Sequence, residues 1–174
     1  MSTSKVKTKV HWDSGDCSIL KNIPFDGHIT KHFTWEEYSN PSSGEDIIAE
    51  VWPESLIHAR IIEDFRNDYY EKNHKGCVAN SWYRTEKFNA RPDVNGAKKS
   101  LHLWGCATDL LVGSPTDAEW KWYIDEVTKL GKKYDTQIEL GRYDWGIHIG
   151  SHIEVWNPYT NLPVYLFDYR KNTL

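Results

Sequence analysis

Two histidines and an aspartate are the residues of this chain whose types and spacing best suit a chemical role. The segment SLHLWGCATDL places His102 and Asp109 seven positions apart around Gly105, and His148 lies in the later segment GRYDWGIHIG. Zinc accepts two imidazoles and one carboxylate as ligands, and a zinc held by only three protein ligands keeps a position for water. A structural zinc is closed by a fourth ligand, usually a thiolate. These residues therefore favour one catalytic zinc, provided that they converge.

Strand geometry sets the condition for that convergence. Side chains alternate between the two faces of a strand, so an odd separation puts two residues on opposite faces. His102 and Asp109 can share a metal only if the backbone turns or bulges between them, and we expect this at Trp104-Gly105. From Asp109 to Val112 the sequence predicts a buried strand that begins at the aspartate.

The segment around His148 has an even spacing instead. If residues 143–155 form one strand, a single face carries Asp144, Gly146, His148, Gly150, His152 and Glu154. The glycines on both sides of His148 would leave open space around a ligand atom. The same face offers candidates for a general base, which accepts the proton of an attacking water. We expect Asp144 in this role, with Glu154 and His152 as alternatives.

Three helices are predicted around these residues. The residues TWEE at 34–37 form a capping box that opens a short helix. Apolar residues three and four apart predict the main core helix over 53–73. In the third helix Ser114 is the expected N-cap, a proline occupies the first helical position, and Gly131 follows the C-terminus.

Strands and turns complete the predicted fold. Residues 76–83 are typical of a buried strand, and 137–168 predict two or three antiparallel strands. We expect an α+β fold with helices packed on an antiparallel sheet. The 174 residues suit one domain, which we place at 31–174 after an irregular N-terminal arm at 1–30 with one or two short strands.

Composition narrows the class of partner. The formal net charge of −4 argues against nucleic acid as the main partner. Aromatic residues make up 14% of the chain, which suits a core and also an aromatic-lined groove for a sugar or peptide. Three scattered cysteines without a CxxC pair indicate a reducing compartment. With no apolar run of signal-peptide or membrane-span length, we expect synthesis in the cytoplasm and no membrane span.

The signature S-x-H-x-x-G-x-A-x-D-L at 100–110 resembles that of the zinc D-alanyl-D-alanine carboxypeptidase family, which includes bacterial cell-wall peptidases and phage endolysins. Four further segments resemble pieces of the family pattern in the same order. They are HFTWEE at 32–37, SWYR at 81–84, the loop at 89–96 and GRYDWGIH at 141–148. The match covers about residues 30–152.

The resemblance implies a zinc carboxypeptidase or hedgehog-like fold in which His102, Asp109 and His148 bind one zinc. It also implies that Arg84 anchors the carboxylate of the substrate, a role for which a planar guanidinium is well suited. The implied reaction is hydrolysis of an amide bond in a peptidoglycan stem peptide. Such an enzyme would reach the cell wall through lysis or as part of a virion.

Two features of the chain depart from the family pattern. Its branches carry an acid where this chain has Trp145 or Gly150, so the resemblance does not identify the base, and Asp144 rests on the spacing argument alone. Trp82 replaces a glycine of the family, and we expect it to narrow the substrate groove. We also expect Ser100 and Trp145 to contact the substrate.

Two other functions are compatible with the same residues. One is a catalytically inactive zinc-binding protein that serves as a virion structural or cell-wall-binding component, with virion proteins as partners. Another is a zinc-stabilised scaffold, in which the metal would hold no exchangeable water. The remaining histidines have the isolated positions typical of structural residues: His11, His28, His32, His58 and His74.

Overall fold

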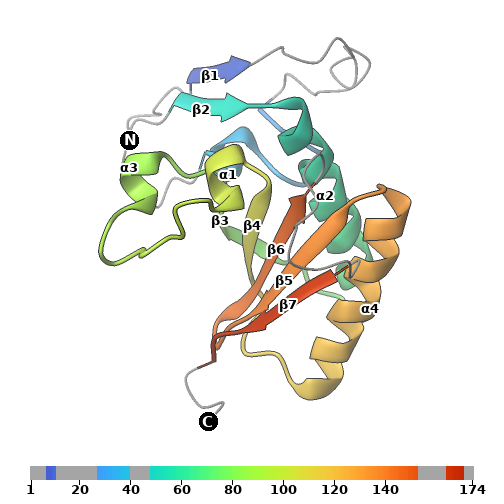
Figure 1. The fold of residues 1–174 in the computed structure, drawn as a ribbon. Coiled ribbons are helices and arrows are strands. Elements are labelled where there is room, and N and C mark those ends of the chain that lie inside the picture. Colours follow the sequence, from blue (N-terminus) through green and yellow to red (C-terminus); the bar gives the residue numbers. More distant parts are fainter. Residues whose placement is uncertain (1–6, 11–26, 40–47, 153–163, 171–174) are drawn as a thin grey trace.

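A computed structural model describes residues 7–10, 27–39, 48–152 and 164–170 of the chain. At its centre lies a five-stranded sheet in the order β3-β4-β6-β5-β7 (Figure 1). Along the chain its strands are β3 (Val78–Ser81), β4 (Ala107–Leu111), β5 (Gln137–Arg142), β6 (Gly146–His152) and β7 (Val164–Asp168). The fold is therefore α+β, as predicted, in a single domain.

The sheet is mixed, so the prediction of a purely antiparallel sheet is wrong. Neighbouring strands are antiparallel except β5 and β7, which run parallel. The position of β6 explains the exception. Because β6 already lies between β4 and β5, the strand that follows it has no free edge of β6 to pair with. β7 returns in the opposite direction to β6 and takes the outer edge of β5.

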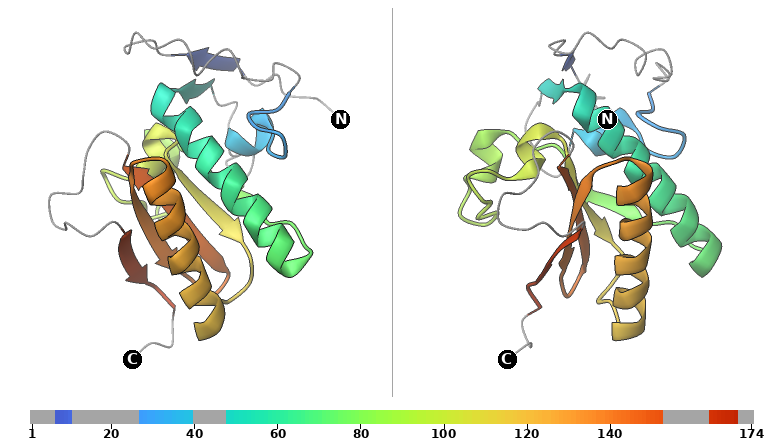
Figure 2. Two further views of the ribbon diagram at one scale, coloured as in Figure 1. Left: turned by 90° about the vertical axis from the view of Figure 1, so that its right-hand side faces the viewer. Right: turned by 45° about the vertical axis from the view of Figure 1, so that its right-hand side comes forward.

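Two long helices, α2 (Pro53–Asn73) and α4 (Asp117–Lys133), cover one face of the sheet (Figure 2). Their apolar sides meet the alternate strand residues that point toward them, which builds the core. The central buried side chains are Ile61, Ile62 and Phe65 of α2, Tyr123, Val127 and Leu130 of α4, and Leu110, Ile138, Leu140, Ile147 and Ile149 of the sheet.

The first two helices begin where the sequence predicts. In α1 (Trp35–Tyr38) the Glu37 amide donates to Thr34 Oγ1 at 3.1 Å, and the Thr34 amide donates to Glu37 Oε2 at 2.8 Å. This confirms the capping box. The core helix predicted over 53–73 is α2.

The ends of α4 differ from the prediction. Thr116, not Ser114, is the N-cap, because Thr116 has Glu119 three residues later and the two form a reciprocal capping box. The helix also continues through Gly131 to Lys133. A glycine alone therefore did not end it.

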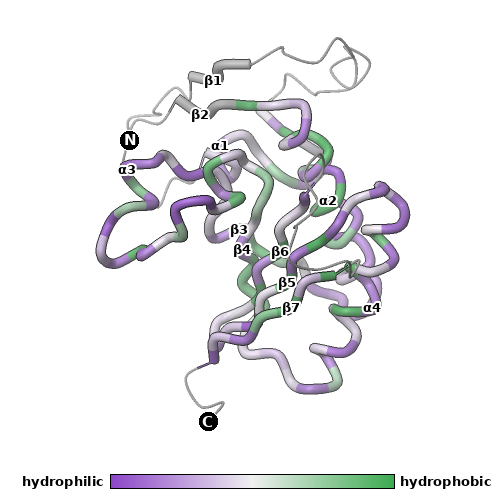
Figure 3. Tube along the Cα trace, viewed as in Figure 1, coloured by the Kyte–Doolittle hydropathy of each residue, from purple (hydrophilic) through white to green (hydrophobic). Residues whose placement is uncertain are grey.

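The remaining elements are short. β1 (Lys7–Val10), inside the expected N-terminal arm, pairs in parallel with β2 (Ile48–Val51), a strand that the sequence did not predict. Between β3 and β4 a largely hydrophilic connection carries α3 (Glu86–Asn89) and the 3-10 helix η3 (Leu101–Trp104) (Figure 3). It lies on the side of the sheet away from α2 and α4 (Figure 2). None of the described helices is long and apolar enough to cross a membrane.

Candidate metal centre

Asp109 and His148 occupy one cross-strand row of the sheet. Asp109 of β4 lies opposite His148 of β6, His148 lies opposite Gly141 of β5, and Gly141 lies opposite Phe167 of β7. Directly opposed residues share a face. The intervening isoleucines of β6 lie in the core under the helices. The row therefore lies on the other face, and the predicted alternation within β6 is confirmed.

His102 reaches the same place from η3. Ser100 Oγ accepts a hydrogen bond from the His102 amide at 3.3 Å and caps this short helix. Gly105 ends it with a φ of 65°, and β4 begins two residues later. A Cβ at Gly105 would lie 2.0 Å from Tyr38 Oη. The turn predicted at Trp104-Gly105 is thus confirmed, and Ser100, expected to contact substrate, has a local structural role here.

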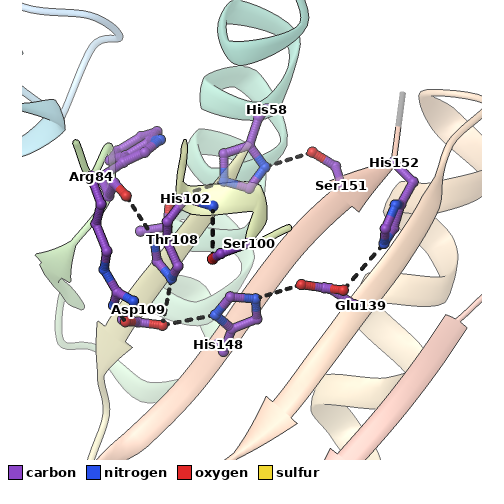
Figure 4. A network of polar contacts seen from close by, with 11 residues as sticks. His58, Arg84, Ser100, His102, Thr108, Asp109, Glu139, His148, Ser151 and His152 are labelled. Carbon is purple, nitrogen blue, oxygen red and sulfur yellow. Dashed lines mark hydrogen bonds and ion pairs between the residues drawn. The ribbon is translucent and has the colours of Figure 1, made fainter. Parts of the chain in front are cut away.

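The three predicted ligands converge. One ligand atom from each of His102, Asp109 and His148 lies within 4.8 Å of the other two, and all three residues are buried. Asp109 Oδ1 is 3.3 Å from His102 Nε2 and 2.8 Å from His148 Nδ1 (Figure 4). Among the described residues this is the one His, Cys, Asp or Glu cluster whose geometry could hold a metal ion.

The surroundings of His102 favour a cation at this point. Its Nδ1–H donates to the Trp82 carbonyl oxygen at 2.6 Å. Burial lowers the pKa of His102 and outweighs the opposing effect of Asp109, so the ring is neutral. Its Nε2 lone pair then faces the carboxylate of Asp109, and two electron-rich atoms lie 3.3 Å apart. A divalent cation bound by both would relieve this repulsion, so the donor set fits zinc.

Glu139 of β5 is a site residue that the sequence reasoning missed. Its Oε1 accepts from His148 Nε2 at 2.9 Å, and its Oε2 accepts from His152 Nε2 at 3.2 Å (Figure 4). Burial raises the pKa of Glu139, but the bonds from His148 and His152 outweigh it and lower this pKa to about 2. The ionised carboxylate therefore orients His148 with Nδ1 toward Asp109. Carboxylates hold metal-binding imidazoles in this way.

Two carboxylates flank His148. Burial lowers the pKa of this imidazole, but the bonds to Asp109 and Glu139 raise it to about 9. Burial likewise raises the pKa of Asp109, yet the hydrogen bond and positive charge of His148 hold it well below its usual range. Both acids are therefore ionised, Asp109 in a buried position and Glu139 in a mostly buried one. They require positive charge beside them, from an imidazolium or from a metal ion.

Arg84 lies beside this centre, and its predicted role in anchoring a substrate carboxylate stays a prediction. Its Nη2 donates to Asp109 Oδ2, and its Nε donates to Ser81 Oγ at 2.8 Å. The guanidinium is thus fixed between a residue of β3 and a ligand of the candidate metal site. It braces Asp109 and places a planar cation at the edge of the centre.

The candidates for the general base are arranged differently from the prediction. Residues 143–155 do not form one strand, because β6 begins only at Gly146. Asp144 is exposed in the turn between β5 and β6. The pKa of Arg170 is raised mainly by Asp168, and the charge of Asp144 makes a smaller contribution. The spacing argument for Asp144 is therefore wrong, and its role as base stays a prediction. Glu154 and His11 lie outside the described residues.

The glycines beside His148 do not leave open space. A Cβ at Gly150 would lie 2.6 Å from Glu139 Cγ, and one at Gly146 would lie 2.1 Å from the carbonyl oxygen of Leu110. Gly150 instead makes room for the Glu139 side chain to reach His148. Gly146 permits the close approach of the β4 backbone.

Trp82 lies in the core and does not narrow a groove. The side chain is fully buried, and its Nε1–H donates to the Gly105 carbonyl oxygen at 3.0 Å. Its ring packs edge-on against Phe33 and against His58. The expectation for Trp82 is therefore wrong, because its large apolar ring is buried in the core and its indole N–H has a hydrogen-bond partner there. Trp145, by contrast, is 38% exposed and stacks on Tyr143.

Comparisons with known proteins add no relative. No protein-family model, curated protein or solved structure gives a significant match to this chain. What the structure itself shows is a buried His-Asp-His group that could hold a metal, on a mixed five-stranded sheet with helices.

Proposed function

We propose that the protein is a zinc-dependent peptidase of the D-alanyl-D-alanine carboxypeptidase type that hydrolyses an amide bond in peptidoglycan stem peptides. The convergence of His102, Asp109 and His148 carries the proposal, because a buried group of two imidazoles and a carboxylate is a ligand set of catalytic zinc. Within the part of the chain that the structure describes, the group has three members. The resemblance at 100–110 supplies the substrate class.

The chain's own residues prepare the site for this reaction. Zinc, when bound, would lower the pKa of a water toward neutrality and polarise the scissile carbonyl. The Trp82 carbonyl fixes the His102 tautomer, and Glu139 fixes the orientation of His148. Arg84 places a rigid cation where a substrate carboxylate or a developing oxyanion can accept its hydrogen bonds.

Proton transfer requires a carboxylate with access to the substrate. Glu139 contacts His148 on the nitrogen that points away from Asp109, a position that suits orientation of the imidazole. Asp144 is exposed in the turn of the hairpin that carries Glu139 and His148. We therefore retain Asp144 as the proposed proton acceptor, with His152 and Glu154 as alternatives.

The test measures new amino groups released from purified bacterial peptidoglycan. We expect release that depends on zinc and stops on chelation. Asp144→Asn should abolish it while zinc stays bound, because a neutral amide cannot accept the proton. The exposed acid Glu71 lies on α2, so Glu71→Gln is a matched control that should behave as the wild type.

Other outcomes would change the proposal. An active Asp144→Asn together with an inactive, zinc-loaded Glu139→Gln would make Glu139 the base. Failure to cleave any peptidoglycan at full zinc loading would favour the inactive zinc-binding component of a virion or cell wall. The position of Asp144 outside β6 is the observation that favours this second function.

A further inference from the structure

We propose that an aromatic surface beside the metal centre binds the pyranose rings of a glycan strand. This aromatic surface consists of Tyr143, Trp145, Tyr165, Phe167 and Tyr169. The first two belong to the turn between β5 and β6, and the others to β7 and the residue that follows it. Three of the five are well exposed, Trp145 by 38%, Tyr165 by 40% and Tyr169 by 66%.

The five rings form one continuous series. Tyr143 stacks on Trp145 with centroids 4.7 Å apart and planes at 21°. On its other side Tyr143 lies 5.6 Å from Tyr169, which lies 5.3 Å from Phe167. Tyr165 continues the series at 6.0 Å from Phe167. Packing of the rings on one another holds each in place, so a ligand would meet a preorganised surface.

Strand alternation puts this surface on the face of the metal centre. Phe167 lies in the same cross-strand row as His148, and Tyr165 lies two residues away along β7. The Tyr169 amide donates to the Arg142 carbonyl oxygen at 2.9 Å, which ties the end of β7 to the hairpin. Figure 1 shows that the turn between β5 and β6 and the end of β7 meet at one end of the sheet.

Phe167 makes the aromatic surface continuous with the metal centre. Its ring crosses β5 at Gly141, where a Cβ would lie 2.2 Å from a ring carbon. The glycine therefore allows the ring to reach His148, at a centroid distance of 5.6 Å. A ligand stacked on the aromatic surface would pass directly beside the proposed zinc ligand.

The chemistry of the surface favours a neutral sugar. Four of its five rings carry a hydroxyl or indole N–H, so each offers a flat apolar face and a polar edge. A pyranose matches this pattern with an apolar C–H face and hydroxyls around its rim. None of the five residues is charged, and the nearby Arg170 is paired with Asp168 at 2.7 Å. A phosphate backbone would instead require a row of cations.

The choice of N-acetylated sugars rests on the proposed function, because a stem peptide is attached to a strand of such sugars. The glycan would lie along the aromatic surface while its peptide enters the metal centre past Phe167. On this basis the protein would recognise the polymer and not only the peptide.

The test is calorimetric titration of the zinc-loaded protein with a tetramer of β-1,4-linked N-acetylglucosamine. We expect saturable binding, weakened about three- to tenfold by Trp145→Ala and likewise by Tyr169→Ala, because each removes one stacking ring. Tyr70→Ala is the matched control. Tyr70 is a 47% exposed tyrosine on α2 that packs on Arg66, and its variant should bind as the wild type does.

Three results would overturn the glycan site: no saturable binding, equal binding by all variants, or self-association of the wild type that Trp145→Ala abolishes. The last would make a second copy of the chain the occupant, and sedimentation velocity would detect it. Cleavage of free stem peptides by the same preparation is measured separately. Cleavage without sugar binding would overturn only the glycan site, and sugar binding without cleavage would overturn only the proposed peptidase.

Discussion

Glu139→Gln should weaken zinc binding without removing the site. The carboxylate accepts from His148 Nε2 at 2.9 Å and is mostly buried, so this charge-assisted bond is well shielded from water. Such a bond contributes roughly 1.5–3 kcal/mol, and loss of a carboxylate partner behind a metal-binding histidine costs about 10- to 100-fold in affinity. The amide of glutamine can still accept one bond but carries no charge. We therefore expect zinc affinity to fall by about 10-fold for glutamine and by up to about 100-fold for Glu139→Ala.

The assay is competition for zinc with a chromophoric chelator, followed by turnover at saturating zinc. The orienting role predicts that excess zinc restores a large part of the activity to Glu139→Gln. His152→Ala is the control for zinc affinity alone, because it removes the second partner of the carboxylate and leaves the bond to His148 in place. Unchanged zinc affinity with complete loss of turnover would refute the reasoning, since it would show that Glu139 takes part in proton transfer.

Four further changes test other parts of the structure. His102→Ala should release zinc, measured by elemental analysis, and stoichiometric zinc in this variant would contradict the ligand assignment. Arg84→Lys should keep the zinc yet lower turnover, since lysine lacks the two-pronged geometry; unchanged kinetics would limit Arg84 to a structural role beside Asp109. Gly105→Ala should cost about 2 kcal/mol in urea unfolding, because its Cβ would meet a tyrosine hydroxyl at 2.0 Å. Burial raises the pKa of Glu63, but hydrogen bonds from His32 and Thr30 outweigh this effect and lower the pKa below 4.5. Glu63→Gln should therefore lower the free energy of unfolding at pH 7 by about 1 kcal/mol. The difference between variant and wild type should shrink as the pH falls through the pKa of Glu63 in the folded protein. Chemical unfolding at several pH values would measure it.

Features that depend on adjacent residues were predictable from the sequence. The capping box at Thr34, the core helix α2 and the turn at Gly105 each follow from side chains within a few positions of one another. The turn was the decisive feature for the metal centre. Once Gly105 reverses the chain, His102 and Asp109 can meet despite their odd separation.

Features that depend on pairing between distant segments were not predictable in this way. Glu139 contacts His148 only because β5 pairs with β6 in a register that sets Glu139 opposite Gly150. No local pattern specifies that register. The same holds for Asp144, since the hairpin turn determines where β6 begins and leaves Asp144 outside it. The parallel edge strand β7 also depends on which sheet edge remains free.

One buried histidine supports the strands of the candidate metal ligands from the other face of the sheet. His58 of α2 contacts Thr108 Oγ1 of β4 at 3.0 Å and Ser151 Oγ of β6 at 2.7 Å, on the helix side of the sheet (Figure 4). On the opposite face the adjacent Asp109 meets His148. A slip of β4 against β6 by one residue would turn the ligands into the core and break the contacts of His58 as well. The register that assembles the candidate metal centre is therefore specified by side-chain contacts on both faces of the sheet.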